Sequence, residues 1–376
     1  MAIMKSTVLL QLKSLTLTYE PEAFPDVKET ISKTILGNPG GIRYRQLDAL
    51  KKVDVIRPLH FFPLRKSGSI ISIMALAERI TYHNGIPYYS FYVRYVSFNP
   101  AYSVKNAKSH DHSMAIHRMG NSFIKEGMKK HAEDFPFLLK DEKADEKKRI
   151  YYAYVEESNY RSLNYTEFFF EKIRDFTTIT YSNIFPRADK RVSKISLSAY
   201  DTLSALLQTS FQKHTFFFLE KEKLLTGYYV LMEGEEIIAG VQAQVNNWKI
   251  EKLPGIMGGF IKNILPYLPV FSRVLKPKRF TFLTFDTIYC QKGSEQLLPV
   301  LFRSVCALTK VYAAMIHIDN ADPLHYLLKK SKKMGLLNTL FSDAHSVVMA
   351  KFVNFTDKEK EPFYHNPVYF SGYDLT

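Results

Sequence analysis

The side chains best suited to chemistry lie in one stretch of the chain, from Arg279 to Asn320. Asp286 stands inside an apolar, aromatic run, where a carboxylate could act as a general base. A polar turn with one glycine follows this run, and backbone N–H groups that precede a helix can gather round an anion. The turn is Gln291-Lys292-Gly293-Ser294. The stretch therefore predicts an anion-binding turn beside a carboxylate, although Asp286 could also simply pair with a lysine at the end of its strand.

Two other groups of residues could carry chemistry, and each has a simpler interpretation. Cys290 could be a nucleophile only with a base beside it, and a buried, inert thiol is the alternative. His110, Asp111, His112 and His117 could suggest a metal, but their segment has no cysteine and no regular ligand spacing. A solvated histidine cluster explains them, so we predict no metal site.

Three elements must hold this stretch in place. The run from Phe280 to Tyr289 predicts a buried strand, and Ala314–Ile318 predicts a second strand. Apolar residues at helical spacing predict a helix between them. Pro299 lacks an N–H and should lie in the first turn, so the helix should begin near Gln296–Leu298. A strand, a helix and a parallel strand together make a crossover unit.

Elements of the same kinds recur in a similar order on both sides of a polar segment, Pro186–Arg191, where we place a domain boundary. Before it, the pattern predicts helices over Asp26–Leu36, Leu47–Ile56 and Leu163–Lys172, and strands over Val8–Tyr19, Ser69–Ile80, Tyr88–Phe98, Ile150–Val155 and Thr177–Ile184. After it, the pattern predicts a helix from Pro323 to about Lys333 and strands over Val192–Leu197, Tyr228–Met232, Ile237–Val245 and Ser346–Phe352. The Asn84-Gly85 pair predicts a hairpin turn.

The composition fits a folded protein of two domains. The chain has 376 residues, 46% hydrophobic and 14% aromatic, which excludes global disorder. A net charge of +14 favours anionic partners, namely nucleic acid, acidic lipid or a phosphorylated cofactor, although scattered lysines can be merely solvated. Two cysteines are too few for a disulfide framework. The N-terminus shows no cleavage site, and the longest apolar run, Ile256–Phe271, is interrupted by Lys262 and prolines. We therefore expect a cytoplasmic protein with no membrane span.

The repeated order of elements resembles the GNAT superfamily of N-acyltransferases, in a tandem form that covers most of residues 6 to 352. In the second half, YYVLMEGEEIIAGVQAQV looks like the family's second and third strands, IYCQKGSEQLL like its fourth strand and pyrophosphate loop, and MIHIDN like its fifth strand. In the first half, VRYVSFNPAY looks like the fourth strand and YYAYVEESN like the fifth.

The resemblance implies an α/β fold built from two GNAT-like domains, each a mixed, mostly antiparallel sheet flanked by helices. The first domain would span residues 1–187 and be degenerate, because its loop has no glycine. The second would span 192–352 and hold the better coenzyme loop. The tail, 353–376, contains many aromatic residues and would pack on the body.

The resemblance also implies a site for acetyl-CoA or another acyl-CoA as co-substrate in the second half. The backbone of Ile288, Tyr289 and Cys290 would meet the pantetheine, and the turn from Gln291 to Ser294 would meet the pyrophosphate. Asn320 would contact the coenzyme, with a cap on the next helix as the alternative. Asp286 would be the base, and Tyr326 would protonate the thiolate. Two residues depart from the family loop, since Cys290 replaces its Gln/Arg and Glu295 its second glycine.

Three functions stay open at this point. The first is an acyl-CoA-dependent N-acyltransferase that acts on a primary amine of a small molecule or peptide. The second is an aminoacyl-tRNA-dependent transferase of the peptidoglycan-bridge type, in which the positive charge would help to hold RNA. The third is a non-catalytic GNAT-like binding or scaffold protein. The sequence does not define the acceptor, the acyl chain or the oligomeric state.

Overall fold

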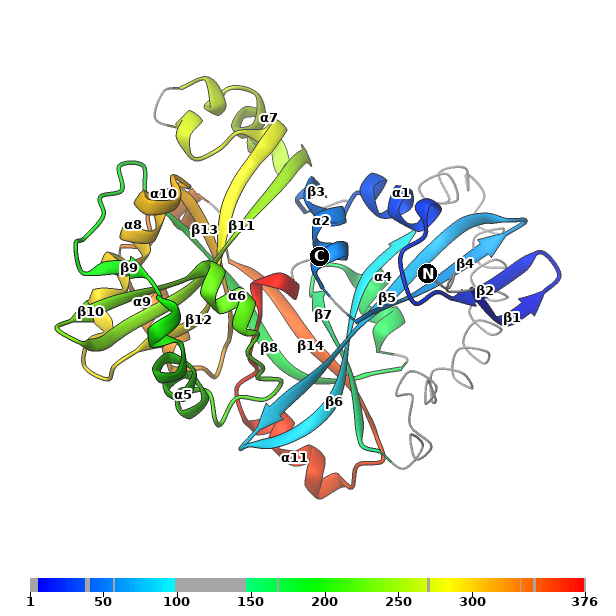
Figure 1. Cartoon of the computed structure of the whole chain (residues 1–376). Helices are drawn as coiled ribbons and strands as arrows, with labels where there is room; N and C mark the ends of the chain where they lie inside the picture. The colour runs from blue at the N-terminus through cyan, green and yellow to red at the C-terminus, as the bar shows by residue number, and fades with distance from the viewer. Residues whose placement is uncertain are drawn as a thin grey trace.

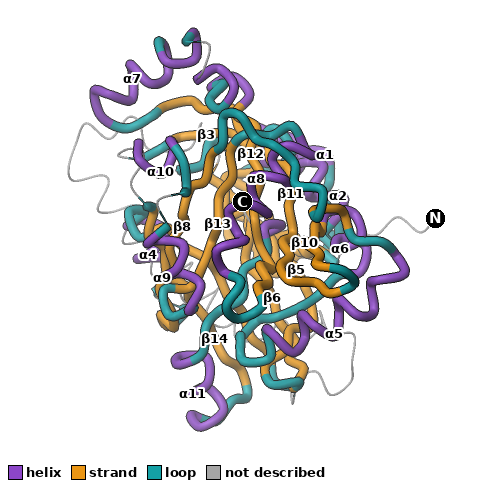
Figure 2. Tube along the Cα trace, turned by 90° about the vertical axis from the view of Figure 1, so that its left-hand side faces the viewer, coloured by secondary structure: helices purple, strands orange, loops and turns teal. Residues whose placement is uncertain are grey.

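The computed structural model describes residues 6–37, 41–56, 58–98, 147–167, 169–268, 271–331, 333–340 and 343–374. The histidine cluster at residues 110–117 and the first half's loop lie outside these ranges. Within them, the strands form one 14-stranded sheet in the order β1-β2-β4-β5-β6-β7-β14-β8-β13-β12-β11-β10-β9, with β3 paired to β11. The sheet runs through the middle of the molecule and helices lie on both sides of it (Figures 1 and 2).

The strands divide between the two halves of the chain. The first half contributes β1 (Thr7–Leu12), β2 (Leu15–Tyr19), β3 (Arg43–Gln46), β4 (Leu59–Lys66), β5 (Ser69–His83), β6 (Ile86–Phe98), β7 (Arg149–Glu156) and β8 (Glu171–Ser182). The second half contributes β9 (Val192–Lys194), β10 (Tyr228–Glu233), β11 (Glu236–Lys252), β12 (Phe280–Cys290), β13 (Ala313–Asp319) and β14 (Ala344–Val353). Among the described strands only β6–β7 and β12–β13 pair in parallel. The predicted α/β class with a mixed, mostly antiparallel sheet is confirmed.

The last strand of each half pairs with strands of the other half. β8 pairs with β13, whereas β14 pairs with β7, and β8 and β14 pair with each other at the centre. The halves therefore share one continuous sheet rather than forming one sheet each. This exchange leaves no unpaired strand edge at the seam, since every central strand has a neighbour on both sides.

Helices cover both faces of the second half. α5 (Tyr200–Ser210) and α6 (Lys221–Gly227) share a core with Val230 of β10, whereas α8 (Leu298–Thr309) shares a core with Leu231. Neighbouring residues of a strand point to opposite faces, so these helices lie on opposite sides of the sheet. The other α-helices within the described ranges are α1 (Pro25–Lys33), α2 (Ala49–Val55), α4 (Tyr160–Thr166), α7 (Gly255–Asn263), α9 (Pro323–Lys330), α10 (Leu336–Leu340) and α11 (Asp357–His365).

The elements around the proposed chemistry match the prediction closely. β12 and β13 fall where two strands were expected, and α8 begins at Leu298 with Pro299 in its first turn. The β5–β6 hairpin turns at Asn84 and Gly85, which have φ values of 49° and 75°. Positive φ at both positions is the geometry that an Asn-Gly turn favours.

Two predicted elements were wrong. Residues 8–19 form a hairpin of two strands, β1 and β2, because the chain reverses at Lys13 with a φ of 44°. The helix expected over Leu163–Lys172 ends at Thr166, and β8 begins at Glu171. Pairing of β8 with a strand on each side stabilises extended backbone there, and local helical spacing does not report such long-range partners. No described helix combines the length and the apolar character needed to cross a membrane.

The C-terminal segment after α11 runs through the centre of the molecule, between the two halves (Figure 1). Val368, Tyr369 and Phe370 are buried. Thr215 and Val368 form a parallel β-bridge, and the phenyl ring of Phe370 lies 4.4 Å from that of Phe176 between centroids. The segment thus contacts residues from both halves of the chain.

Candidate active site

Each half contains a pair of parallel strands that separate part-way along their length. β12 pairs with β13 only from Leu283 to Phe285, yet β12 continues to Cys290. β6 pairs with β7 only from Tyr89 to Tyr92, yet β6 continues to Phe98. Both pairs open at their carboxyl ends. The fold therefore has two V-shaped openings, one in each half.

A local distortion bends the longer strand of each pair at its opening. Thr287 on β12 has a φ of 47°, and the register of β12 with β11 shifts between Gly240 and Gln242. Tyr95 on β6 has a φ of 52°, and the register of β6 with β5 shifts between Ile73 and Ala75. Such conformations cost about 1–3 kcal/mol in residues other than glycine, so the surrounding structure must hold them. The distortion directs β12 away from β13 immediately after Asp286.

Asp286 lies at the point where β12 leaves β13, and only 6% of it is exposed. Its Oδ1 accepts a hydrogen bond of 2.6 Å from the Thr287 hydroxyl, and its Oδ2 accepts one of 2.6 Å from the Gly372 backbone N–H. Burial raises the pKa of this carboxyl to about 7, although both hydrogen bonds and the positive charge of Lys223 oppose the rise. A carboxyl that titrates near neutral pH is suited to accept and release a proton.

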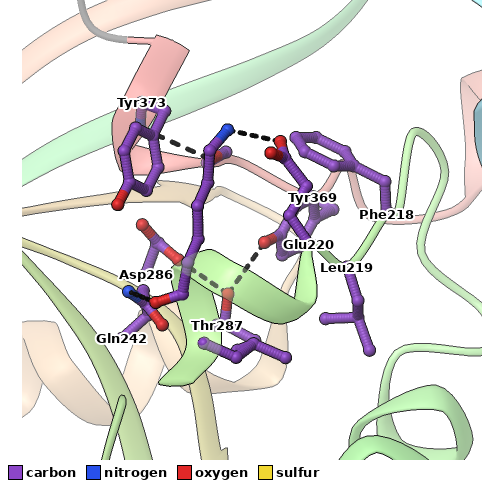
Figure 3. Close-up of a pocket in the computed structure, with 11 residues that line it drawn as sticks. Phe218, Leu219, Glu220, Gln242, Asp286, Thr287, Tyr369 and Tyr373 are labelled. Carbon is purple, nitrogen blue, oxygen red and sulfur yellow. Dashed lines mark hydrogen bonds and ion pairs between the residues drawn. The ribbon is translucent and has the colours of Figure 1, made fainter. Parts of the chain in front are cut away.

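The C-terminal segment closes over Asp286. The Tyr369 hydroxyl lies 2.8 Å from the Thr287 hydroxyl, which links it to the carboxylate (Figure 3). Arg79 donates two hydrogen bonds of 2.8 Å to the Asp374 carboxylate, so the segment is anchored just beyond Gly372. A Cβ on residue 372 would lie 2.7 Å from Asp286 Oδ2, so only glycine allows the backbone to approach this closely.

Asp286 and Thr287 line two small cavities. One, of about 40 Å³, lies in the opening between β12 and β13, where Ile288, His317 and Phe370 also line it. The other, of about 20 Å³, is lined by Glu220, Lys223, Gln242, Tyr369 and Tyr373 (Figure 3). Such volumes hold one to about three water molecules, so each cavity has room for reacting atoms rather than for a whole substrate.

The second cavity presents groups that suit an ammonium ion. The Lys223 ammonium pairs with the Glu220 carboxylate and lies 4.1 Å from the centre of the Tyr373 ring. A carboxylate beside an aromatic face binds cations by charge and by cation–π attraction. Burial lowers the pKa of Lys223, while Glu220 opposes this change. The protein's own amine therefore occupies a place where a substrate amine would also be stabilised.

The turn after β12 uses most of its own backbone donors. Gln291 N–H donates to the Ile238 carbonyl at 2.8 Å, and Ser294 N–H donates to the Gln291 carbonyl at 3.0 Å. Gly293 N–H donates to the Glu295 carboxylate at 3.0 Å, which lowers the pKa of Glu295. The carboxylate thus already takes the position that an anion would need at Gly293.

Three further candidates from the sequence lie near this turn or beyond it. Burial raises the pKa of the Cys290 thiol to about 11, so few molecules carry the nucleophilic thiolate at neutral pH. Asn320 directly follows β13, and its side chain accepts a hydrogen bond of 2.6 Å from the Thr177 hydroxyl. The side chain that caps α9 is that of Asp322. Tyr326 is 60% exposed on α9, where its hydroxyl contacts Lys330. Tyr326 does not line either cavity beside Asp286.

Comparisons with known proteins identify the fold. The sequence matches no family model and no curated protein. A crystal structure of Saccharomyces cerevisiae N-myristoyltransferase with bound myristoyl-CoA matches with a TM-score of 0.57 and 9% identity, over 95% of this chain and 86% of that chain. A second structure of that enzyme with myristoyl-CoA matches with a TM-score of 0.55 and 9% identity, over 95% and 82% of the two chains. The chain shares the fold of these two structures over 95% of its length. At this identity the match establishes the architecture alone.

Within this fold, several residues near Asp286 were missed by the sequence reasoning, among them Gly372, Tyr369 and His317. Gly372 and Tyr369 come from the tail, whose many aromatic residues were the only signal of burial. His317 lies on β13 and lines the cavity in the opening, and burial lowers its pKa to about 4, so it stays neutral at physiological pH. No cluster of His, Cys, Asp and Glu within the described ranges is arranged to hold a metal.

Proposed function

We propose that this protein is an acyl-CoA-dependent N-acyltransferase that transfers an acyl group to a primary amine, with Asp286 as general base. The observation that carries the proposal is the position and pKa of Asp286. Its carboxyl lies where β12 and β13 separate, lines a cavity on each side and titrates at about pH 7. The fold shared with N-myristoyltransferase supports the same class of reaction.

The two cavities correspond to the two reactants. The acyl thioester would enter the opening between β12 and β13, with its carbonyl carbon next to Thr287 and Ile288. The amine would enter from the side of Glu220 and Tyr373, whose carboxylate and ring suit an ammonium ion. Asp286 would then lie between the amine and the thioester, within reach of the proton that must leave.

The reaction is one of acyl transfer. A substrate ammonium ion has a pKa of about 10, so the amine is protonated at neutral pH and must lose a proton before it can attack. Asp286 accepts this proton, and the amine nitrogen forms a bond to the thioester carbonyl carbon. The nitrogen then loses its second proton as the C–S bond breaks with its electron pair on sulfur, and the thiolate takes up that proton. The products are an amide and free coenzyme A, and Asp286 releases the first proton to solvent and returns to its ionised form.

The turn at residues 291–294 is our proposed contact for the pyrophosphate of the coenzyme. For this contact, the Glu295 side chain must rotate away from Gly293 and free its N–H, which the partial exposure of Glu295 permits. Lys292 is exposed on the same turn and adds positive charge. The structural neighbours do not favour the aminoacyl-tRNA alternative, because the bound donor named for them is myristoyl-CoA.

Calorimetry and turnover assays test this proposal in sequence. The full-length protein is titrated with acetyl-CoA and with longer acyl-CoAs, and free thiol release is then measured with a panel of primary amines. We expect binding of at least one acyl-CoA, amine-dependent thiol release, and loss of release but not of binding in Asp286→Asn. Absence of both heat and thiol release with every donor would leave the non-catalytic scaffold as the better account.

Hydrogen–deuterium exchange with bound acyl-CoA locates the donor site. Protection of residues 288–294 would support binding of the acyl-CoA in the opening between β12 and β13. Protection confined to Tyr92–Phe98 would instead place the donor in the first half, where β6 and β7 form the second opening. Asp286 would then lose its proposed role as the base.

A further inference from the structure

A lobe between β11 and β12 extends beyond the sheet. It contains α7, and three short 3-10 helices follow at Leu265–Tyr267, Phe271–Arg273 and Pro277–Arg279. Both views show α7 at the edge of the molecule, beyond the ends of the strands (Figures 1 and 2). Residues 253–279 include five basic residues and no acidic residue. The lobe is therefore both apolar and strongly cationic.

The lobe has a packed base and an apolar tip. At its base, Val274 and Leu275 are each 3% exposed and pack in one core with Trp248 and Phe280. Near its tip, three large apolar side chains face solvent, with exposed fractions of 50% for Ile264, 83% for Tyr267 and 44% for Leu268. Packing within the chain thus explains the base of the lobe but not its tip.

Basic side chains flank the packed base of the lobe, and the 3-10 helix that carries Arg273 contacts the one that carries Tyr267. Arg273, Lys276, Lys278 and Arg279 are all exposed. Among the described residues none of these four forms an ion pair with a carboxylate. Arg273 lies over the Phe185 ring at 5.1 Å, and Arg279 donates to the Asn247 side chain. Their positive charge is therefore available to an external anionic partner.

We propose that this lobe, defined by Ile264, Tyr267, Leu268 and the four exposed basic residues, docks on the surface of an anionic lipid bilayer. Tyrosine and aliphatic side chains partition into the headgroup region, where a ring can keep its hydroxyl in water. Lysine and arginine near the surface are attracted to acidic lipids. A nucleic acid would use the basic residues but would leave Ile264 and Leu268 in water, so a bilayer fits both features. This proposal does not depend on the proposed N-acyltransferase activity.

Vesicle co-sedimentation of the full-length protein tests the proposal. Vesicles of phosphatidylcholine alone are compared with vesicles that contain a third phosphatidylserine. We expect binding to the anionic vesicles that weakens as salt rises. Each basic residue near such a surface contributes about fivefold in affinity, so Lys276→Gln with Lys278→Gln should weaken binding about 25-fold. Tyr267→Ser with Leu268→Ser should weaken it at least about tenfold, because both side chains return to water.

Matched variants elsewhere on the surface control for charge and hydrophobicity. Lys190→Gln with Lys194→Gln removes the same charge, and both lysines are exposed. Tyr160→Ser with Leu197→Ser removes the same residue types, which are 72% and 68% exposed. Neither control should change vesicle binding by more than about twofold.

Three results would overturn the proposal. The first is absence of binding to anionic vesicles, and the second is equal loss in the lobe variants and their controls. The third is self-association without vesicles that the Tyr267 and Leu268 substitutions abolish, because the tip would then be an interface between copies of this chain. All the substituted side chains are exposed, so urea unfolding should show unchanged stability and exclude misfolding as a cause.

Discussion

Asp286→Asn offers the most direct test of the link between the site and the stability of the fold. The pKa of Asp286 is about 7 in the folded protein, whereas the pKa of an aspartic acid in an unfolded chain is about 4. Between these values the folded state binds more protons than the unfolded state, so stability falls as pH rises. The wild-type protein therefore spends free energy of folding to keep this carboxylate ionised above pH 7.

The size of the effect follows from the two pKa values. From about pH 5 to about pH 8, the Asp286 carboxyl should lower the free energy of unfolding of the wild-type protein by about 2.5 kcal/mol. Asparagine does not ionise in this range, so the variant lacks this contribution. It also offers one acceptor oxygen to the two donors, Thr287 and Gly372, which costs about 1 kcal/mol at every pH.

Urea unfolding at both pH values measures the difference. Relative to the wild type, Asp286→Asn should become more stable by about 2.5 kcal/mol as pH rises from about 5 to about 8, and it should lose acyl transfer. Asp201→Asn, which replaces an exposed carboxylate on α5, is the matched control. If the stability difference between Asp286→Asn and the wild type is the same at both pH values, the assigned pKa and the reasoning built on it fail.

Four further substitutions examine the parts around Asp286. Gly372→Ala places a Cβ against the Asp286 carboxylate and should lower the free energy of unfolding by about 1–3 kcal/mol in urea titrations, whereas Gly259→Ala, which meets no neighbour, should not. Lys223→Met removes a charge that lowers the pKa of Asp286, so the acidic limb of the pH–rate profile should move to higher pH. An unchanged limb would mean that Lys223 does not affect the pKa of the catalytic base. Glu295→Gln should tighten acyl-CoA binding several-fold by calorimetry because it removes a carboxylate from the turn, and weaker binding would place the pyrophosphate elsewhere. Tyr326→Phe should leave kcat within about twofold, since its hydroxyl is exposed and contacts Lys330, and a large loss would restore it as the acid for the thiolate.

The crossover unit could be predicted because its signals are local. Apolar runs, a glycine turn and Pro299 define β12, α8 and β13 almost to the residue. Each signal depends on neighbours within a few positions, and backbone preferences act over the same range. The same reasoning placed Asp286 on β12 but could not assign it a pKa, because burial by distant segments produces the rise.

The exchange of β8 and β14 could not be predicted, because strand pairing is a long-range property. The pattern predicted a strand over Thr177–Ile184 but a helix as far as Lys172, whereas β8 begins at Glu171, where it pairs with β14. Similarly, the turn at Gly293 has a glycine in the right place, yet the Glu295 carboxylate takes its N–H. A sequence motif shows which residues are present. It does not show which acceptor lies within hydrogen-bond distance of a given backbone N–H.

The tail shows why the site depends on the whole chain. Gly372 donates to a carboxylate 86 positions earlier, and Arg79 holds Asp374 across a separation of 295 positions. These contacts bring the end of the second half, a strand of the first half and the opening between β12 and β13 to one point. The tail covers Asp286 and Arg79 anchors the tail, so the burial that raises the pKa of Asp286 depends on contacts between distant segments. A base that titrates near neutral pH is therefore a product of the tertiary fold.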